Sequence, residues 1–435
     1  MIGRFPQGVI MHRLAGLAGL AAAVVMLAAG TSGAQTPSVV PIASLTSDDY
    51  SDLEPLRSRL EGVRVVALGE STHGTAEFSQ VKFRLIRFLH EAMGFDVVAF
   101  ESDAWLCGRA AAAADKQPAR TTLTGCVYGV WHTHEVLALF DYMRASWSTD
   151  RPLRLAGIDV QPIGPNKDVR PAWLAGVVAT LDSDYAARVQ ALDEAYLAAY
   201  ALGGSARRQA LRSDRDRLIA GYADLADFLD RNRARLIERH AGTADPLAPL
   251  LARQSAWSSL QYLRSQTAAS AVEGVEARDW GMARNLIDLA AQDPQSKIIV
   301  WAHNAHIAHN NERIDLTGFD EPQIASRGAG SWMKPHFGAG LFTVGVYGQS
   351  GVSLRNNREP MPFSEVRPGS LEARSIPGDA PAALFIAPAD WTHDPLWGRP
   401  STGKYWGVGD LPMVPGEQYD AVLMLRHVSP PQYLD

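Results

Sequence analysis

Seven short apolar runs constrain the fold of this chain more than any other feature. They are rich in valine, isoleucine, leucine and phenylalanine and show little alternation between polar and apolar side chains, which is typical of strands buried on both faces of a helix-covered sheet. The runs are VRVVALG (63–69), FDVVAFE (95–101), LRLAGID (153–159), KIIVWAH (297–303), LFTVGVYG (341–348), AALFIA (382–387) and AVLMLRHV (421–428).

The segments between these runs have helical patterns. Residues 79–93, SQVKFRLIRFLHEAM, separate the first two runs and predict a crossover helix in a β-α-β unit. From 170 to 290 the chain has no strand signal, and apolar residues recur at helical spacing. The stripe consists of Leu218, Tyr222, Leu225, Leu229 and Leu236.

The sequence therefore predicts an α/β fold with a mostly parallel central sheet flanked by helices and with an inserted helical hairpin or bundle at 170–290. A length of 435 residues allows two or three domains, or one elaborated α/β domain. The net charge is −6, and no run of lysine and arginine contains interleaved aromatic residues. We therefore expect no nucleic-acid partner.

Residues 1–34 have the features of a secretory signal peptide. Basic residues precede the apolar run LAGLAGLAAAVVMLAAG, and the small residues Ser32 and Ala34 occupy the −3 and −1 positions of a cleavage site. The alternative is an uncleaved membrane anchor, but the run is short for a span. We expect cleavage after Ala34, a periplasmic or secreted protein, and no stable membrane insertion after cleavage.

The chain contains two cysteines, Cys107 and Cys126. An exported chain meets oxidising conditions, so we expect a disulfide between them, and the alternative is two buried free thiols. Neither cysteine has the CxxC or Cys/His spacing of a zinc site.

Four of the apolar runs end in polar residues of catalytic type. If the strands are parallel, their carboxyl ends meet at one edge of the sheet, where ligands bind in open α/β sheets. A single acid at a strand end is more commonly a helix cap or a turn former, and Asp159 stays open to that interpretation; four such ends together predict a site. The residues are Glu70 and His73, Glu101 and Asp103, Asp159, and His303, Asn304, His306 and His309.

The turn GESTHG after the first run has glycines on both sides of the acid and the imidazole. We expect Gly69 and Gly74 to allow a tight, left-handed backbone, and Ser71 and Thr72 to cap the next helix. A serine hydrolase would show a G-x-S-x-G elbow, which GESTHG is not. Glutamate and histidine therefore remain as the reactive groups.

Four motifs together resemble the erythromycin esterase-like family in order and spacing. The motifs are LGESTHGTAEF (68–78), GFDVVAFES (94–102), RDWGMARN (278–285) and VWAHNAHI (300–307). The resemblance covers nearly all of an expected domain at 35–435. The resemblance implies an α/β core with a helical insertion. It also implies the hydrolysis of an ester or macrolactone by activated water, with macrolides as candidate substrates and antibiotic resistance as a candidate role.

Residue by residue, His73 resembles the family's general base. Glu70, Glu101 and one histidine of WAHNAH resemble its supporting residues, and the choice between His303 and His306 stays open. The chemistry of the side chains agrees, because neutral histidine is a base near neutral pH, a carboxylate can fix its tautomer, and a protonated second histidine or a helix-start N–H can stabilise an oxyanion.

Two other interpretations use the same residues. In the first, the glutamates and histidines are ligands of Zn or Mn in a metal-dependent hydrolase or protease. We favour a site without a cofactor, because the chain has no HExxH motif and no cysteine-rich ligand set. In the second, the protein is a periplasmic binding protein without catalytic activity.

Aromatic and basic residues beside the motifs are candidates for substrate binding. They are Trp105, Trp131, Arg278 and Trp280. Aromatic residues line small-molecule clefts, although most of those in a chain of this size belong to the core. For Arg278, the alternative is a structural salt bridge. The expected partner is a small-molecule ester or lactone.

Overall fold

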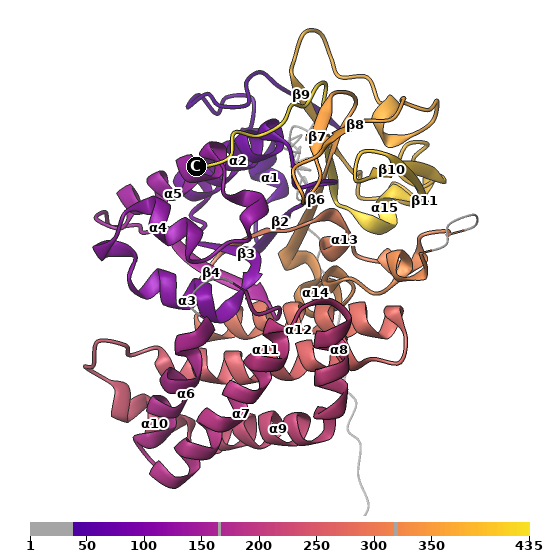
Figure 1. Ribbon diagram of the computed structural model, residues 1–435. Helices are drawn as coiled ribbons and strands as arrows, with labels where there is room; N and C mark the ends of the chain where they lie inside the picture. Colours follow the sequence, from indigo (N-terminus) through magenta and orange to yellow (C-terminus); the bar gives the residue numbers. More distant parts are fainter. Residues whose placement is uncertain (1–37, 164–166, 317–320) are drawn as a thin grey trace, which may run out of the picture. The chain divides into compact units, whose positions relative to one another are not determined.

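The computed structural model describes residues 38–163, 167–316 and 321–435 (Figure 1). The expected signal peptide, 1–34, lies outside these residues. The described residues belong to one compact unit. None of the helices in the described ranges is long and apolar enough to cross a membrane.

An eight-stranded sheet forms the centre of this unit, in the order β1-β9-β12-β6-β2-β5-β3-β4. The six strands from β12 to β4 are parallel, and β9 is antiparallel to both of its neighbours. The strands are β1 (Val39–Ile42), β2 (Val65–Leu68), β3 (Val97–Asp103), β4 (Arg154–Asp159), β5 (Ile298–Trp301), β6 (Leu341–Gly348), β9 (Ala382–Ile386) and β12 (Ala421–Leu425). All seven apolar runs form strands of this sheet as predicted. The eighth strand, β1, was not predicted from the sequence.

The two faces of the sheet are buried in separate cores, which explains why the runs show so little alternation. In β2, Val66 and Leu68 belong to the core on the side of α2 (Ala76–Met93) and α5 (His134–Ser146). Val65 and Ala67 belong to the core on the side of α12 (Ala271–Gln292) and α14 (Ala329–Phe337). Successive side chains point to opposite faces, so a strand covered on both sides must be apolar throughout.

The stretch predicted to be helical contains helices and no strand, and it has its own apolar core. Its helices lie together at the bottom of Figure 1. They are α6 (Arg170–Ala179), α7 (Ser183–Ala201), α8 (Gly204–Ser213), α9 (Arg215–Arg231), α10 (Arg233–His240) and α11 (Ala248–Thr267), followed by α12. The predicted apolar stripe is buried, but it is divided between α9 and α10 at Asn232. The predicted fold class is confirmed.

The last third of the chain contains two β-hairpins that the sequence did not reveal. They are β7–β8 (Val352–Leu354 and Pro360–Pro362) and β10–β11 (Ser401–Tyr405 and Gly409–Met413). Each forms its own two-stranded sheet. Their strands are short and rich in glycine, proline and polar residues, so they lack the apolar signal of the central strands.

A disulfide links Cys107, in α3 (Ala104–Ala112), to Cys126, which follows α4 (Ala119–Thr124). This pairing was expected from the sequence and is confirmed. Both cysteines are buried beside the edge of the sheet.

Replacing both cysteines, in a Cys107→Ala/Cys126→Ala variant, should lower the free energy of unfolding by about 3 kcal/mol, because the bond closes a loop of 19 residues in the unfolded chain. The measurement is urea unfolding followed by circular dichroism. Reduced wild-type protein is the control and should show a similar loss. Equal stability of oxidised and reduced wild type would contradict the prediction.

Candidate active site

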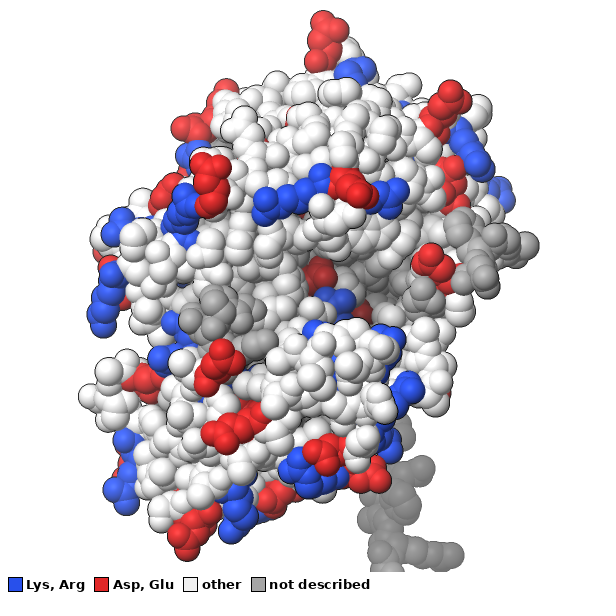
Figure 2. Space-filling model, in the orientation of Figure 1, with Lys and Arg blue, Asp and Glu red and all other residues white. Residues whose placement is uncertain are grey.

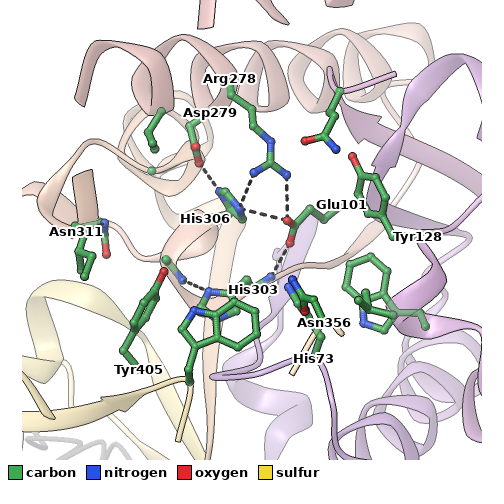
Figure 3. A pocket seen from close by; sticks show the side chains of 18 of the residues that line it. His73, Glu101, Tyr128, Arg278, Asp279, His303, His306, Asn311, Asn356 and Tyr405 are labelled. Atoms are coloured by element: carbon green, nitrogen blue, oxygen red, sulfur yellow. Dashed lines mark hydrogen bonds and ion pairs between the residues drawn. The ribbon is translucent and has the colours of Figure 1, made fainter. Parts of the chain in front are cut away.

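A cavity of about 650 Å³ lies at the carboxyl ends of β2, β3 and β5. Figure 2 shows it as a hollow with atoms of acidic and basic residues inside it, and Figure 3 shows the side chains of 18 of the residues that line it. The carboxyl end of β4 lies at the same edge of the sheet, but Asp159 at this end does not line the cavity. Of the candidate residues at the strand ends, His73, Glu101, His303 and His306 line the cavity. The other lining residues include Tyr128, Trp131, Arg278, Asp279, Asn356, Arg358, Tyr405, Trp406 and Tyr433.

His73 is oriented by Glu70. Its Nδ1 lies 2.6 Å from Glu70 Oε1. A carboxylate only accepts, so Nδ1–H is the donor, and the lone pair of the neutral imidazole is on Nε2. Among the described residues Nε2 has no hydrogen-bond partner, and the His73 side chain, 12% exposed, faces the cavity. This geometry leaves a free base at the wall of the cavity.

Glu70 does not line the cavity but lies behind His73, fully buried. It accepts a hydrogen bond from Trp131 Nε1 at 2.9 Å and pairs with the ammonium group of Lys82. Burial alone would raise the pKa of Glu70, but Lys82 and the hydrogen bond to His73 outweigh it and lower that pKa. The carboxylate is therefore charged at neutral pH and holds His73 in one tautomer.

Lys82 was not singled out from the sequence. Burial lowers its pKa to about 8 against the pull of Glu70, and its ammonium group lies 3.7 Å from the centroid of the Trp301 ring. A signal was present, because Lys82 falls among Phe78, Val81, Leu85 and Ile86 on the apolar face of α2. A lysine on such a face needs a buried acid as its partner.

Glu101, near the end of β3, contacts the WAHNAH segment and is not hydrogen-bonded to His73 among the described residues. Its Oε2 accepts the backbone N–H of His303 at 2.8 Å, and its Oε1 accepts from Arg278 Nη2 at 3.1 Å. His306 Nε2 also lies 3.1 Å from Oε1. Burial would raise the pKa of Glu101, but His306 and Arg278 hold it well below its usual value. Of the two acids, it is Glu70 that is hydrogen-bonded to His73.

The two candidate histidines of WAHNAH have opposite electrostatic surroundings. His306 lies between Asp279, whose Oδ1 is 2.6 Å from Nδ1, and Glu101 (Figure 3). Burial would lower its pKa, but these two acids raise it to about 10. Arg278 Nη1 lies 3.4 Å from His306 Nε2, and both are donors when His306 is protonated, so this contact opposes the charge only in part. His306 is an imidazolium at neutral pH.

His303, in contrast, is neutral. Its Nδ1 accepts the backbone N–H of Ala305 at 3.2 Å, so its Nε2–H donates to the carbonyl oxygen of Ser71 at 3.1 Å. Burial lowers its pKa to about 3. The geometry thus separates the two histidines, because only His306 carries a positive charge to the cavity.

Asp159 anchors Arg278 and also shapes its own turn. Its carboxylate accepts from Arg278 Nε at 3.0 Å and Nη2 at 2.5 Å, and from the Tyr128 hydroxyl at 2.6 Å. It also accepts the backbone N–H of Val160 at 2.7 Å. Both interpretations of this acid, turn former and site residue, therefore apply.

The glycines beside His73 have a different role from the expected one. Neither Gly69 nor Gly74 has a positive φ, so the prediction of a left-handed backbone is wrong. Instead, a Cβ atom on Gly69 would lie 2.0 Å from the Asn304 side chain, and one on Gly74 would lie 2.0 Å from the backbone of Leu354. Glycine is needed here because other segments approach closely.

The capping prediction for Ser71 and Thr72 is also wrong. Helix α2 begins at Ala76, and its N-cap is Thr75, which makes no side-chain cap. The backbone N–H of Ala76 donates instead to Ser429 O at 2.9 Å. The hydroxyls of Ser71 and Thr72 are buried and have no hydrogen-bond partner among the described residues. Ser71 therefore lacks the contact with a base that a nucleophile requires.

Two of the four expected substrate-binding residues are placed elsewhere. Trp131 and Arg278 line the cavity. Trp105 is buried, packs against Trp173 with ring centroids 5.9 Å apart, and does not line the cavity. Trp280 packs against Trp332 at 5.7 Å and does not line the cavity either. Both occupy helix positions that face other helices, which their proximity to the motifs in sequence could not reveal.

The donor atoms do not fit the Zn or Mn interpretation. Within the described ranges, no group of three or more histidine, cysteine, aspartate or glutamate side chains could hold a metal ion. Both nitrogens of His303 are bonded to backbone groups, and both nitrogens of His306 are bonded to carboxylates.

The fold and the site define an α/β protein with histidine and glutamate side chains, rather than a serine elbow, at the carboxyl edge of a mostly parallel sheet. The sequence model of the Erythromycin esterase family matches residues 90–428, and the chain belongs to this family. The match contains Glu101, Arg278 and WAHNAH, while the Glu70–His73 turn precedes it.

Relatives support the assignment. The hydrolase YbfO of Bacillus subtilis (strain 168) is 29% identical over 87% of this chain and 87% of its own length. Erythromycin esterase type I of Escherichia coli is 29% identical over 60% of this chain and 65% of its own. The structure of a mutant erythromycin esterase, EreC, in its open conformation covers 91% of this chain and 99% of its own, with a TM-score of 0.65 and 17% identity, and shows the same fold.

A His306→Asn variant should lose stability in a pH-dependent way. The folded-state pKa of His306 is raised to about 10 by Asp279 and Glu101, so its contribution is complete below the unfolded value of 6.5 and disappears as the pH rises through 10. We expect urea unfolding to show a deficit of about 3 kcal/mol at pH 6, typical of a broken buried ion pair, that shrinks towards pH 10.

His309→Asn is the matched control with the opposite sign. Burial lowers the pKa of His309 to about 4, so the wild type loses stability as the pH falls from 6.5 to 4, and the deficit of this variant should shrink in acid. A His306→Asn deficit that is constant between pH 6 and pH 10 would contradict the charge assigned to His306.

Proposed function

We propose that this protein is an esterase in which His73 activates a water molecule for attack on an ester or lactone carbonyl. The observation that carries the proposal is the orientation of His73, because its Nδ1 is held by buried, ionised Glu70 while its Nε2 is free at the cavity wall. Neutral imidazole held in this way is a general base suited to neutral pH.

The reaction proceeds in two steps. In the first, His73 Nε2 takes a proton from water while the water oxygen bonds to the carbonyl carbon, which produces a tetrahedral oxyanion. In the second, the bond from carbon to the alcohol oxygen breaks, and the His73 imidazolium returns the proton to that oxygen. The products are a carboxylic acid and an alcohol, and no co-reactant other than water is required.

Arg278 and His306 are the groups that stabilise the oxyanion. Both are positively charged and line the cavity beside His303. Within the described residues, Arg278 Nη1 is bonded to no carboxylate, since Asp159 and Glu101 occupy Nε and Nη2. Charges fixed in place before the reaction stabilise a developing oxyanion most effectively.

The proposed substrate is a small ester or lactone. The cavity volume of about 650 Å³ is in the usual range for small-molecule sites, and Tyr128, Trp131, Tyr405 and Tyr433 give it aromatic walls. Membership of the family and the name of the Escherichia coli relative make a macrolactone a candidate. We propose that no cofactor takes part and that the chain acts after export and cleavage behind Ala34.

A His73→Ala variant should lose about 10²–10⁴-fold in kcat, the usual effect of removing a general base, but should still fold, because Lys82 and Trp131 remain bonded to Glu70. Hydrolysis of p-nitrophenyl acetate and of a macrolactone is the assay, with and without EDTA. His393→Ala is the matched control, because that side chain is 85% exposed, and it should retain wild-type kcat.

A Ser71→Ala variant should keep most of its activity, because the Ser71 hydroxyl contacts no base. Inactivity of this variant, together with an acyl-enzyme trapped on wild-type Ser71 by mass spectrometry, would replace the water mechanism with a serine nucleophile. Loss of wild-type activity in EDTA that a single added metal restores would overturn the proposal of a site without a cofactor. Binding without turnover of any ester would indicate a binding protein.

A further inference from the structure

Two non-glycine residues in the described ranges have a positive φ, and both line the cavity. They are Arg358, with a φ of 66° in the loop of β7–β8, and Trp406, with a φ of 54° in the turn of β10–β11. A bulky side chain in this conformation is strained, and such strain persists only where the surroundings enforce it, most commonly at functional sites. The two hairpins that the sequence did not reveal therefore both reach the site.

Trp406 contacts both histidines at the strand ends. Its ring centroid is 5.2 Å from that of His73 in an edge-to-face arrangement, and 5.3 Å from that of His303 with the two ring planes tilted by 32°. The ring centroids of Trp131 and His303 lie 5.1 Å and 5.3 Å, respectively, from that of His73. The His73 imidazole is thus packed against three rings.

The backbone of Trp406 is tied to the same place. Its N–H donates to the carbonyl oxygen of Ser71 at 2.9 Å, and this oxygen also accepts from His303 Nε2. One oxygen atom therefore joins the turn that carries Glu70 and His73, the segment after β5, and the tip of the β10–β11 hairpin.

We propose that Trp406 is a positioning residue for His73, an inference that rests on the esterase function proposed above. The hydrogen bond that His73 Nδ1–H donates to Glu70 holds this nitrogen but leaves the imidazole free to pivot about that bond. The Trp406 and Trp131 rings both pack against the imidazole and remove this freedom. His73 Nε2 therefore stays directed at the substrate carbonyl. A displacement of about 1 Å at a reacting atom can cost 10²-fold in rate.

The local sequence makes the side chain's role separable from that of the backbone. Gly407 follows with a φ of 72°, so two consecutive residues of the turn are left-handed. Asn-Gly is the favoured pair in such hairpin turns, whereas tryptophan in the first position is strained. Trp406→Asn should therefore relieve the backbone and keep the thermal midpoint of unfolding unchanged or raise it, while it removes the ring.

The test compares Trp406→Asn with Trp406→Phe, using p-nitrophenyl acetate as the probe. We expect Trp406→Asn to lower kcat about tenfold to a hundredfold with little change in KM, and Trp406→Phe, which keeps a ring, to restore most of the loss. Val408→Ala, at a 41% exposed position beside the same turn, is the matched control and should behave as wild type. Trp406→Gly, which also relieves the strain, replaces the asparagine variant if that variant does not fold.

Imidazole ¹⁵N NMR of His73 supplies a readout that needs no turnover. Wild type and Trp406→Phe should show one sharp Nδ1–H tautomer, and Trp406→Asn should show exchange broadening of that signal. Wild-type kcat with a sharp signal in Trp406→Asn would overturn the inference, and so would a rise in KM alone, which would make Trp406 a substrate contact. If wild type hydrolyses no ester, the proposed function fails, and the NMR comparison still decides whether Trp406 positions His73.

Discussion

The buried carboxylate of Glu70 is the group on which the rest of the site depends. A charge taken out of water must be paired, and here Lys82, Trp131 and His73 satisfy it from three different elements. The ammonium group of Lys82 is itself buried, which lowers its pKa, and the carboxylate opposes this shift. The same ion pair therefore joins α2 to the end of β2 and fixes the tautomer of the imidazole that faces the cavity.

The three histidines of the site differ because their neighbours differ. His303, bonded to backbone groups and buried, is neutral, whereas His306 is charged between Asp279 and Glu101. His73 has one nitrogen held and one free. Identical side chains can therefore differ in charge and in hydrogen bonding within one cavity, because their surroundings differ.

Much of the fold followed from the apolar runs, since strands buried on both faces have a distinctive composition. The meeting of Glu70, Glu101, Asp159 and His303 at one edge followed from the parallel arrangement of their strands. The hairpins β7–β8 and β10–β11 could not be predicted from the sequence, because their strands are short and only partly buried. Lys82 left a weak signal, as a charged residue on an apolar helix face, and Trp406 left none.

By itself the sequence determined the class of fold, the strand ends that carry the polar residues of the site and the one pair of cysteines that could form a disulfide, because each of these depends on local pattern or on the number of candidates. Only the tertiary structure decided that Glu70 rather than Glu101 orients His73, that His306 rather than His303 is charged, and that Gly69 and Gly74 make room for Asn304 and Leu354. These choices depend on distances of a few ångströms between segments far apart in the chain, and hydrogen bonds and ion pairs are decided at that scale.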